Sequence, residues 1–219
     1  LCCMVLIMLP TTVLAADGPM DTIPKYDVSI DVYNRTSDIS IKDSRSYYIY
    51  SSVPDKLRDT WAWDKKIFIK GDKTAPHVFI DGVNIKMSPS SKGPAIELNK
   101  KASAYLYFIG KDSTLQGADG RAAIQKNRSE GQLYVLARTG TTVTCKGGYR
   151  AAGIGGSWAI RNIGDSMFNM DMYGHGVNMH FGSQSNPDYW GGTINATGGE
   201  YGAGIGAGSW GHSGHSGNT

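Results

Sequence analysis

Aromatic and basic side chains accompany two glycine-rich stretches in the second half of the chain. These stretches are GTTVTCKGGYRAAGIGGS, residues 140–157, and GGTINATGGEYGAGIGAG, residues 191–208. Aromatic rings on exposed turns stack on sugar rings, and guanidinium and ammonium groups bind carboxylates. The residues that offer this chemistry are Tyr149, Trp158, Tyr201 and Trp210, with Lys146, Arg150 and Arg121 as basic neighbours. We interpret them as a candidate binding patch for an acidic sugar. The alternative is that the rings only pack over the outside of the fold.

The patch lies on an internal repeat. Aligned at an offset of 51 residues, the two stretches share glycines, an Ala-Gly-Ile-Gly phrase and a threonine. Four apolar anchors are each followed nine residues later by an isoleucine, the pairs being Met87 and Ile96, Leu115 and Ile124, Cys145 and Ile154, Ala196 and Ile205. Successive isoleucines are separated by 28, 30 and 51 residues. Repeats of this length indicate stacked supersecondary units.

The repeated units have the period of strands. Apolar residues alternate in pairs such as Val78 and Ile80 or Leu106 and Phe108, and glycines punctuate the segments. We therefore predict an all-β fold, a right-handed parallel β-helix whose equivalent residues stack in columns. One inward column is predicted to hold Met87, Leu115, Cys145 and Ala196, and another Ile96, Ile124, Ile154 and Ile205. This column position makes Cys145 a small buried hydrophobic residue rather than a nucleophile.

The remaining segments complete the predicted organisation. Residues 1–16 are interpreted as a secretory signal peptide whose basic n-region is missing, because an apolar run precedes a proline and small residues. Residues 17–66 are expected to form N-terminal strands and an irregular cap segment, and residues 67–219 the coils of the β-helix, incomplete at the C-terminus. Residues 157–190 are expected to add one more, diverged coil. The chain is accordingly expected to be truncated at both ends.

Composition narrows the classes of partner. The chain has 219 residues, 40% hydrophobic residues and 29 glycines, enough for a core with many turns or close backbone contacts. A net charge of +3 without a basic run argues against nucleic-acid binding. The N-terminal apolar run is shorter than a membrane span, so no membrane insertion is expected after signal removal, although a short anchor is the alternative. The predicted location is secreted or extracellular, associated with a cell wall. The oligomeric state is left open.

Three stretches carry a family resemblance. HVFIDGVNIKM, GRAAIQ followed by GQLYVLARTGTTVTCKGGYRAAGIGGS, and GGTINATGGEYGAGIGAG resemble the bacterial, mostly clostridial, secreted carbohydrate-binding parallel β-helix domains. This family is typified by a polygalacturonate-binding member and is related in fold to pectate lyases. The resemblance covers residues 67–208. It implies binding of acidic plant or bacterial cell-wall polysaccharide, and calcium as the one cofactor. The shared motif is one that builds coils, so it is stronger evidence for the fold than for the function.

Two other functions stay open beside a non-catalytic binding module. The first is a structural stalk or adhesin repeat of a bacterial surface protein, which would show only Thr, Asn, Ser and Lys ladders on its outer face. The second is a calcium-dependent polysaccharide lyase, which needs clustered carboxylates and a positioned base. Asp112 and Asp119 with Arg121 and Arg150 are the residues expected to form such a patch. Surface charge is their alternative role.

Overall fold

The computed structural model describes residues 24–88, 91, 93–99, 101–126, 130–158, 176–183 and 188–208. Within them the chain forms parallel strands and the short 3-10 helix η1 (Asp55–Leu57), which confirms the predicted parallel β-helix. No helix in these ranges is long and apolar enough to cross a membrane. The expected signal peptide, Trp210 and most of the Met-rich segment lie outside the described residues.

Three sheets run along the solenoid. Sheet A contains β1 (Val28–Asp31), β3 (Ser46–Tyr50), β5 (His77–Asp81), β8 (Ala104–Ile109), β11 (Leu133–Ala137) and β14 (Met179–Phe181). Sheet B contains β2 (Ile39–Ile41), β4 (Ile67–Lys70), β7 (Ile96–Asn99), β10 (Ile124–Lys126), β13 (Ile154–Gly155) and β16 (Ile205–Gly206). Sheet C contains β6 (Asn84–Lys86), β9 (Ser113–Gln116), β12 (Thr142–Lys146) and β15 (Thr193–Thr197).

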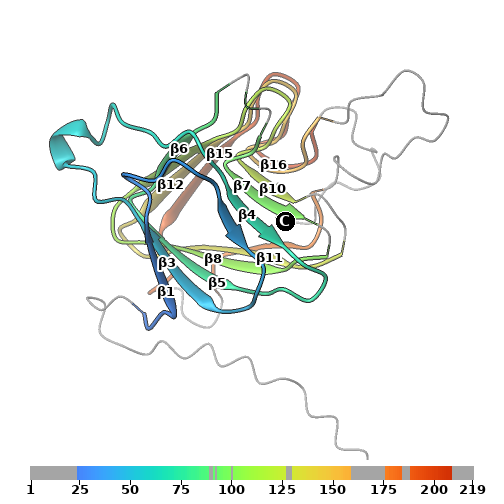
Figure 1. Ribbon diagram of the computed structural model, residues 1–219. Coiled ribbons are helices and arrows are strands. Elements are labelled where there is room, and N and C mark those ends of the chain that lie inside the picture. The colour runs from blue at the N-terminus through green and yellow to red at the C-terminus, as the bar shows by residue number, and fades with distance from the viewer. Residues whose placement is uncertain are drawn as a thin grey trace, which may run out of the picture.

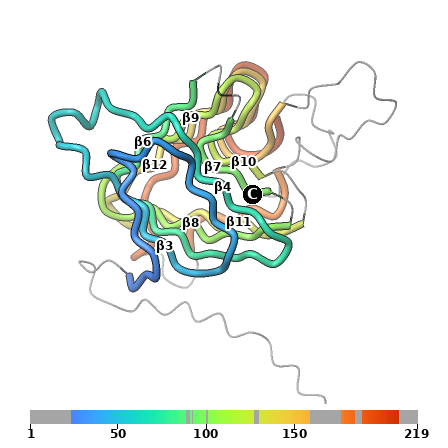
Figure 2. Tube along the Cα trace, in the orientation of Figure 1, coloured from blue at the N-terminus to red at the C-terminus, as the bar shows by residue number. Residues whose placement is uncertain are grey.

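Each coil visits the sheets in the order A, C, B. Four successive coils contribute a strand to all three sheets, the first being β5, β6 and β7. Figure 1 looks nearly along the axis, so the strands of one sheet overlie one another around a common interior. The backbone trace in Figure 2 shows the coils nested from blue to red.

Isoleucines form one wall of the core, as predicted. Ile124 is the register partner of Ile96 on one side and of Ile154 on the other, and Ile154 pairs with Ile205. The column extends upstream through Ile67 and Ile39. Adjacent strands are about 4.8 Å apart, so these side chains are in van der Waals contact along the axis. Ile154 is fully buried.

The second predicted column is correct except at Met87. Cys145 pairs with Leu115 and Ala196, but the partner of Leu115 is Ile85. Ile85 and Met87 point to the same side of the strand. The connection from β6 to β7 is two residues longer than those of the later coils, so counting nine residues back from Ile96 reaches Met87 instead of Ile85. Trp63 precedes Ile85 in the column through an isolated parallel bridge. Cys145 is fully buried as expected, and burial raises the pKa of its thiol to about 12.

The expected extra coil within residues 157–190 is wrong. β12 pairs directly with β15 and β13 with β16, so no rung lies between them. The sequence separation between paired residues of adjacent coils grows along the interval. It is 30 for Ile124 and Ile154, 46 for Leu133 and Met179, and 51 for Thr142 and Thr193. The long interval is therefore one coil with two insertions, one between β13 and β14 and one between β14 and β15.

Strands upstream of residue 67 are part of the solenoid. β3 pairs with β5, and β2 pairs with β4, so the N-terminal strands belong to the same sheets as the later coils. The irregular segment around η1 takes the place of a sheet C strand in this first part. Its Trp63 inserts into the core, where the indole Nε1 donates a hydrogen bond to the Arg35 carbonyl oxygen at 2.8 Å.

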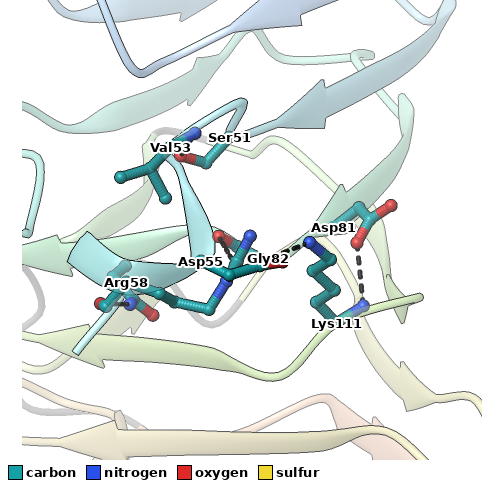
Figure 3. Close-up of polar contacts among 8 residues, drawn as sticks. Ser51, Val53, Asp55, Arg58, Asp81, Gly82 and Lys111 are labelled. Atoms are coloured by element: carbon teal, nitrogen blue, oxygen red, sulfur yellow. Dashed lines mark hydrogen bonds and ion pairs between the residues drawn. The ribbon is translucent and has the colours of Figure 1, made fainter.

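Charged groups attach the η1 segment to the turns between sheets A and C (Figure 3). The Lys111 ammonium lies 2.8 Å from a carboxylate oxygen of Asp55, and the Lys111 backbone N–H donates to Asp81 at 2.8 Å. The Arg58 guanidinium donates to the Gly82 carbonyl oxygen at 3.1 Å. These contacts hold an irregular loop against two consecutive coils without a strand ladder.

Candidate functional site

Three hydrogen-bonded turns stack where the chain passes from sheet C to sheet B. They span residues 118–121, 148–151 and 199–202. Each is closed by a backbone hydrogen bond from its fourth residue to its first, of 2.9, 3.0 and 2.8 Å respectively. The turns also bond to one another, because Gly120 N–H donates to the Tyr149 carbonyl and Arg150 N–H donates to the Glu200 carbonyl, each at 2.9 Å. The stack is therefore a continuous backbone ladder along the edge of the solenoid.

The third residue of each turn has positive φ. The values are 73° for Gly120, 60° for Arg150 and 64° for Tyr201. Glycine adopts this conformation freely, whereas a residue with a Cβ atom pays roughly 1–2 kcal/mol. Two strained non-glycine residues at equivalent positions of adjacent coils indicate a use for their side chains, because such strain concentrates at functional sites.

The side chain of Arg150 lies among three aromatic rings. The centre of its guanidinium is 5.0 Å from the ring centroid of Tyr149, 5.2 Å from that of Trp158 and 5.9 Å from that of Tyr201. Trp158 reaches this place because its backbone N–H donates a hydrogen bond to the Gly120 carbonyl oxygen at 3.0 Å. Its ring would contact a Cβ atom on Gly120 at 3.4 Å. Cation–π attraction to these rings holds the guanidinium at the turn.

The positive charge of Arg150 is not neutralised within the described part of the chain. No carboxylate there forms an ion pair with it, and its Nε is buried without a hydrogen-bond partner. Tyr149 is 40% exposed and Tyr201 69% exposed, so the aromatic side of the site faces solvent. A half-buried arginine beside exposed rings can bind a planar anion attached to an apolar ring face.

The structure thus brings together four of the seven residues predicted from sequence: Tyr149, Arg150, Trp158 and Tyr201. Lys146 is exposed and ends β12, and Gly147 alone separates it from the middle turn. Arg121 ends the first turn, and its carbonyl oxygen accepts a hydrogen bond from Gly148 at 2.9 Å. Trp210 lies outside the described residues.

The carboxylates expected for a lyase do not form one patch. Asp112 precedes β9 and accepts a hydrogen bond from the Thr142 N–H at 2.7 Å, whereas Asp119 lies in the turn beyond the other end of β9. A four-residue strand therefore separates them, roughly 13 Å at about 3.3 Å per residue. Among the described residues no three His, Cys, Asp or Glu side chains are grouped to hold a metal ion. Calcium, which the family resemblance implies, stays a prediction.

Sequence reasoning missed an aromatic column on the outer face of sheet A. The rings of His77, Tyr105, Tyr134 and His180 stack in register, with successive centroids 4.6, 4.5 and 4.5 Å apart and interplanar angles of 14° or less. Their faces cover one another, so only ring edges and the two ends of the stack remain for a ligand. The signal was present in the sequence, since residues 77, 105 and 134 recur at the coil spacing.

A second outward column packs beside the first. It includes Phe79 and Tyr107, and Trp190 from the β14–β15 insertion lies over Tyr107 with ring centroids 5.1 Å apart. Tyr107 is only 3% exposed. This part of sheet A is therefore a second apolar cluster outside the central core, and the insertion covers it.

Comparisons with protein families, with curated proteins and with solved structures find no match to this chain. The case for a function consequently depends on the chemistry of its own residues, and the stacked turns around Arg150 are where that chemistry is concentrated.

Proposed function

We propose that this protein is a non-catalytic, secreted or cell-surface module that binds acidic polysaccharide such as polygalacturonate. The observation that carries the proposal is the guanidinium of Arg150, which has no carboxylate partner in the described residues and lies among Tyr149, Trp158 and Tyr201. The resemblance to secreted carbohydrate-binding β-helix domains points the same way.

The site suits a uronate because two of its groups match two features of that sugar. The fork of guanidinium N–H donors fits a carboxylate, and the exposed ring of Tyr201 offers a face to the C–H side of a pyranose. The backbone ladder and the surrounding rings hold Arg150 in place before ligand arrives, so little ordering is required on binding.

Substitution of Arg150 by glycine tests the proposal. Glycine accepts φ of 60° without strain, so the variant should fold at least as well as the wild type. A charge-assisted hydrogen bond contributes about 1.5–3 kcal/mol, so affinity for polygalacturonate fragments should fall about tenfold or more. Isothermal titration calorimetry measures the affinity, and thermal unfolding verifies the fold.

The matched control is Lys101→Gln, which removes one exposed positive charge between sheets B and A and should leave affinity unchanged. Unchanged binding by a folded Arg150→Gly variant would refute the proposal. The same samples, incubated with polygalacturonate, should release no unsaturated uronate, and a rise in ultraviolet absorbance from such products would instead support the lyase.

A structural stalk is the second candidate, because the outer face of sheet C carries polar ladders. Asn84, Thr114, Thr144 and Asn195 stack in one column, and Lys86, Gln116, Lys146 and Thr197 in the next. A stalk has no need of a strained arginine among aromatic rings. A glycan array separates the two, since a stalk should leave every acidic glycan unbound.

A further inference from the structure

Two lysines on the outer face of sheet C are aligned along the solenoid axis. Lys86 ends β6 and Lys146 ends β12, and the register places Gln116 of β9 between them in the same column. Both lysines are exposed, and neither forms an ion pair with a carboxylate of the described residues. Two rungs separate them, which is roughly 10 Å at about 4.8 Å per rung.

We propose that the acidic polysaccharide lies along the solenoid axis beside the edge of sheet C, with Lys86 as a second anion-binding subsite beyond Lys146 and Arg150. This inference rests on the proposed function. It adds the direction in which the polysaccharide lies and names Lys86 as the residue that only a longer polysaccharide reaches. The unit that the site recognises is then a run of several uronates rather than one sugar.

The distribution of charge selects this direction. From Arg150, a ligand running along the strands of sheet C would pass the neutral Thr144 and Thr142, and one running towards β13 would pass alanine and glycine. Along the axis towards the N-terminal coils it meets three cationic or neutral polar residues, Arg121, Gln116 and Lys86, and one carboxylate, Asp119, in the turn that Arg121 ends.

The surface along this line fits a polyanion. None of the outward residues of β6, β9, β12 and β15 is acidic; they are Asn84, Lys86, Thr114, Gln116, Thr142, Thr144, Lys146, Thr193, Asn195 and Thr197. Hydroxyl and amide groups at every rung can hydrogen-bond sugar hydroxyls. The spacing between adjacent rungs is close to the length that one pyranose adds to an extended polysaccharide. Cations two rungs apart therefore fit carboxylates on every second sugar.

The test uses substitutions taken from the same column. Lys86→Gln copies Gln116, and Lys146→Thr copies Thr197, so both side chains are already accommodated by neighbouring rungs. Affinity is measured by calorimetry for digalacturonate, which is too short to reach from Arg150 to Lys86, and for a decamer, which spans both.

We expect Lys86→Gln to lower affinity for the decamer about two- to fivefold, as for an exposed charge pair, and to leave the dimer unaffected. The variant should also show a weaker dependence of decamer affinity on salt. Lys146→Thr should weaken both ligands. An axial arrangement is overturned if Lys86→Gln leaves the decamer affinity unchanged, or if it weakens the dimer to the same degree.

The Arg150→Gly variant in the same titrations separates the two proposals. If Arg150→Gly loses both ligands while Lys86→Gln loses neither, the binding module stands and the axial direction is wrong. If the wild-type protein binds neither dimer nor decamer, both proposals fail.

Discussion

Lys126 occupies a position where the preceding coils of sheet B have aliphatic side chains. Its register partners along the column are Leu98, then Ile69 and Ile41. Only 1% of Lys126 is exposed, and its ammonium donates a hydrogen bond to the Glu130 carbonyl oxygen at 3.2 Å. Burial lowers the pKa of Lys126 from 10.5 to about 8. A cation inside an apolar column opposes folding until it loses its proton.

The stability of the protein should therefore rise with pH. The unfolded chain holds the Lys126 proton up to pH 10.5, whereas the folded chain releases it near pH 8, so the free energy of unfolding increases between these values. Urea denaturation at pH 7.5 and 9.5 measures the increase. The control is Lys126→Met, which should be more stable at pH 7.5 and should lack this increase. A parallel rise in both proteins would assign the effect to other groups.

At the scale of elements, the stacked turns are possible only because of close backbone contact between coils. A Cβ atom on Gly148 would lie 1.9 Å from the Ala118 carbonyl oxygen, and one on Gly199 would lie equally close to the Gly148 carbonyl. Residues 118–121 and 199–202 thus press on the middle turn from both sides. The second glycine of the repeated Gly-Gly pair is required by this contact, which explains why it recurs with the coil.

Gly148→Ala should accordingly separate adjacent turns. The obstructing atom belongs to backbone, which cannot move without breaking the ladder, so we expect a loss of about 1–3 kcal/mol in the free energy of unfolding. Gly93→Ala is the control, because the one close contact of its Cβ would be the flexible end of Met87 at 3.1 Å, and its other neighbours would lie at an ordinary 3.8 Å. Chemical denaturation of the two variants compares them. Equal losses would show that the turns tolerate expansion.

At the scale of the whole molecule, each coil is stabilised mainly by the coils next to it. The isoleucine column shows the consequence, since Ile154 is fully buried between Ile124 and Ile205, whereas Ile205 in the last described coil is partly exposed. The same residue type in the same column therefore contributes differently according to its rank along the axis.

Alanine substitutions in this column should reveal that difference. Ile154→Ala should lower the free energy of unfolding by about 2–5 kcal/mol, as for a fully buried isoleucine. Ile205→Ala should cost clearly less, because part of its surface already contacts water. Urea denaturation monitored by intrinsic fluorescence measures both. A larger loss for Ile205→Ala would contradict a description based on neighbouring coils.

The sequence predicted the stacking well because strand period and coil length both leave marks in the positions of apolar residues. It failed where two interpretations share a pattern. Ile85 and Met87 have the same parity, so spacing alone could not choose between them. An interval of 51 residues suits two coils as well as one coil with insertions. The residues of the candidate site were found from their turn positions, whereas their convergence on Arg150 depends on backbone angles that composition does not record.

The column that begins at Trp63 and passes through Ile85, Leu115 and Cys145 to Ala196 decreases in bulk from indole to methyl. In the same last coil, sheet A supplies Phe181 where earlier coils have Val78, Leu106 and Val135. The rungs are consequently not interchangeable parts. Each rung fits only its own position in the order. Exchanging two of them would place two large side chains against each other at one level and leave a void at another.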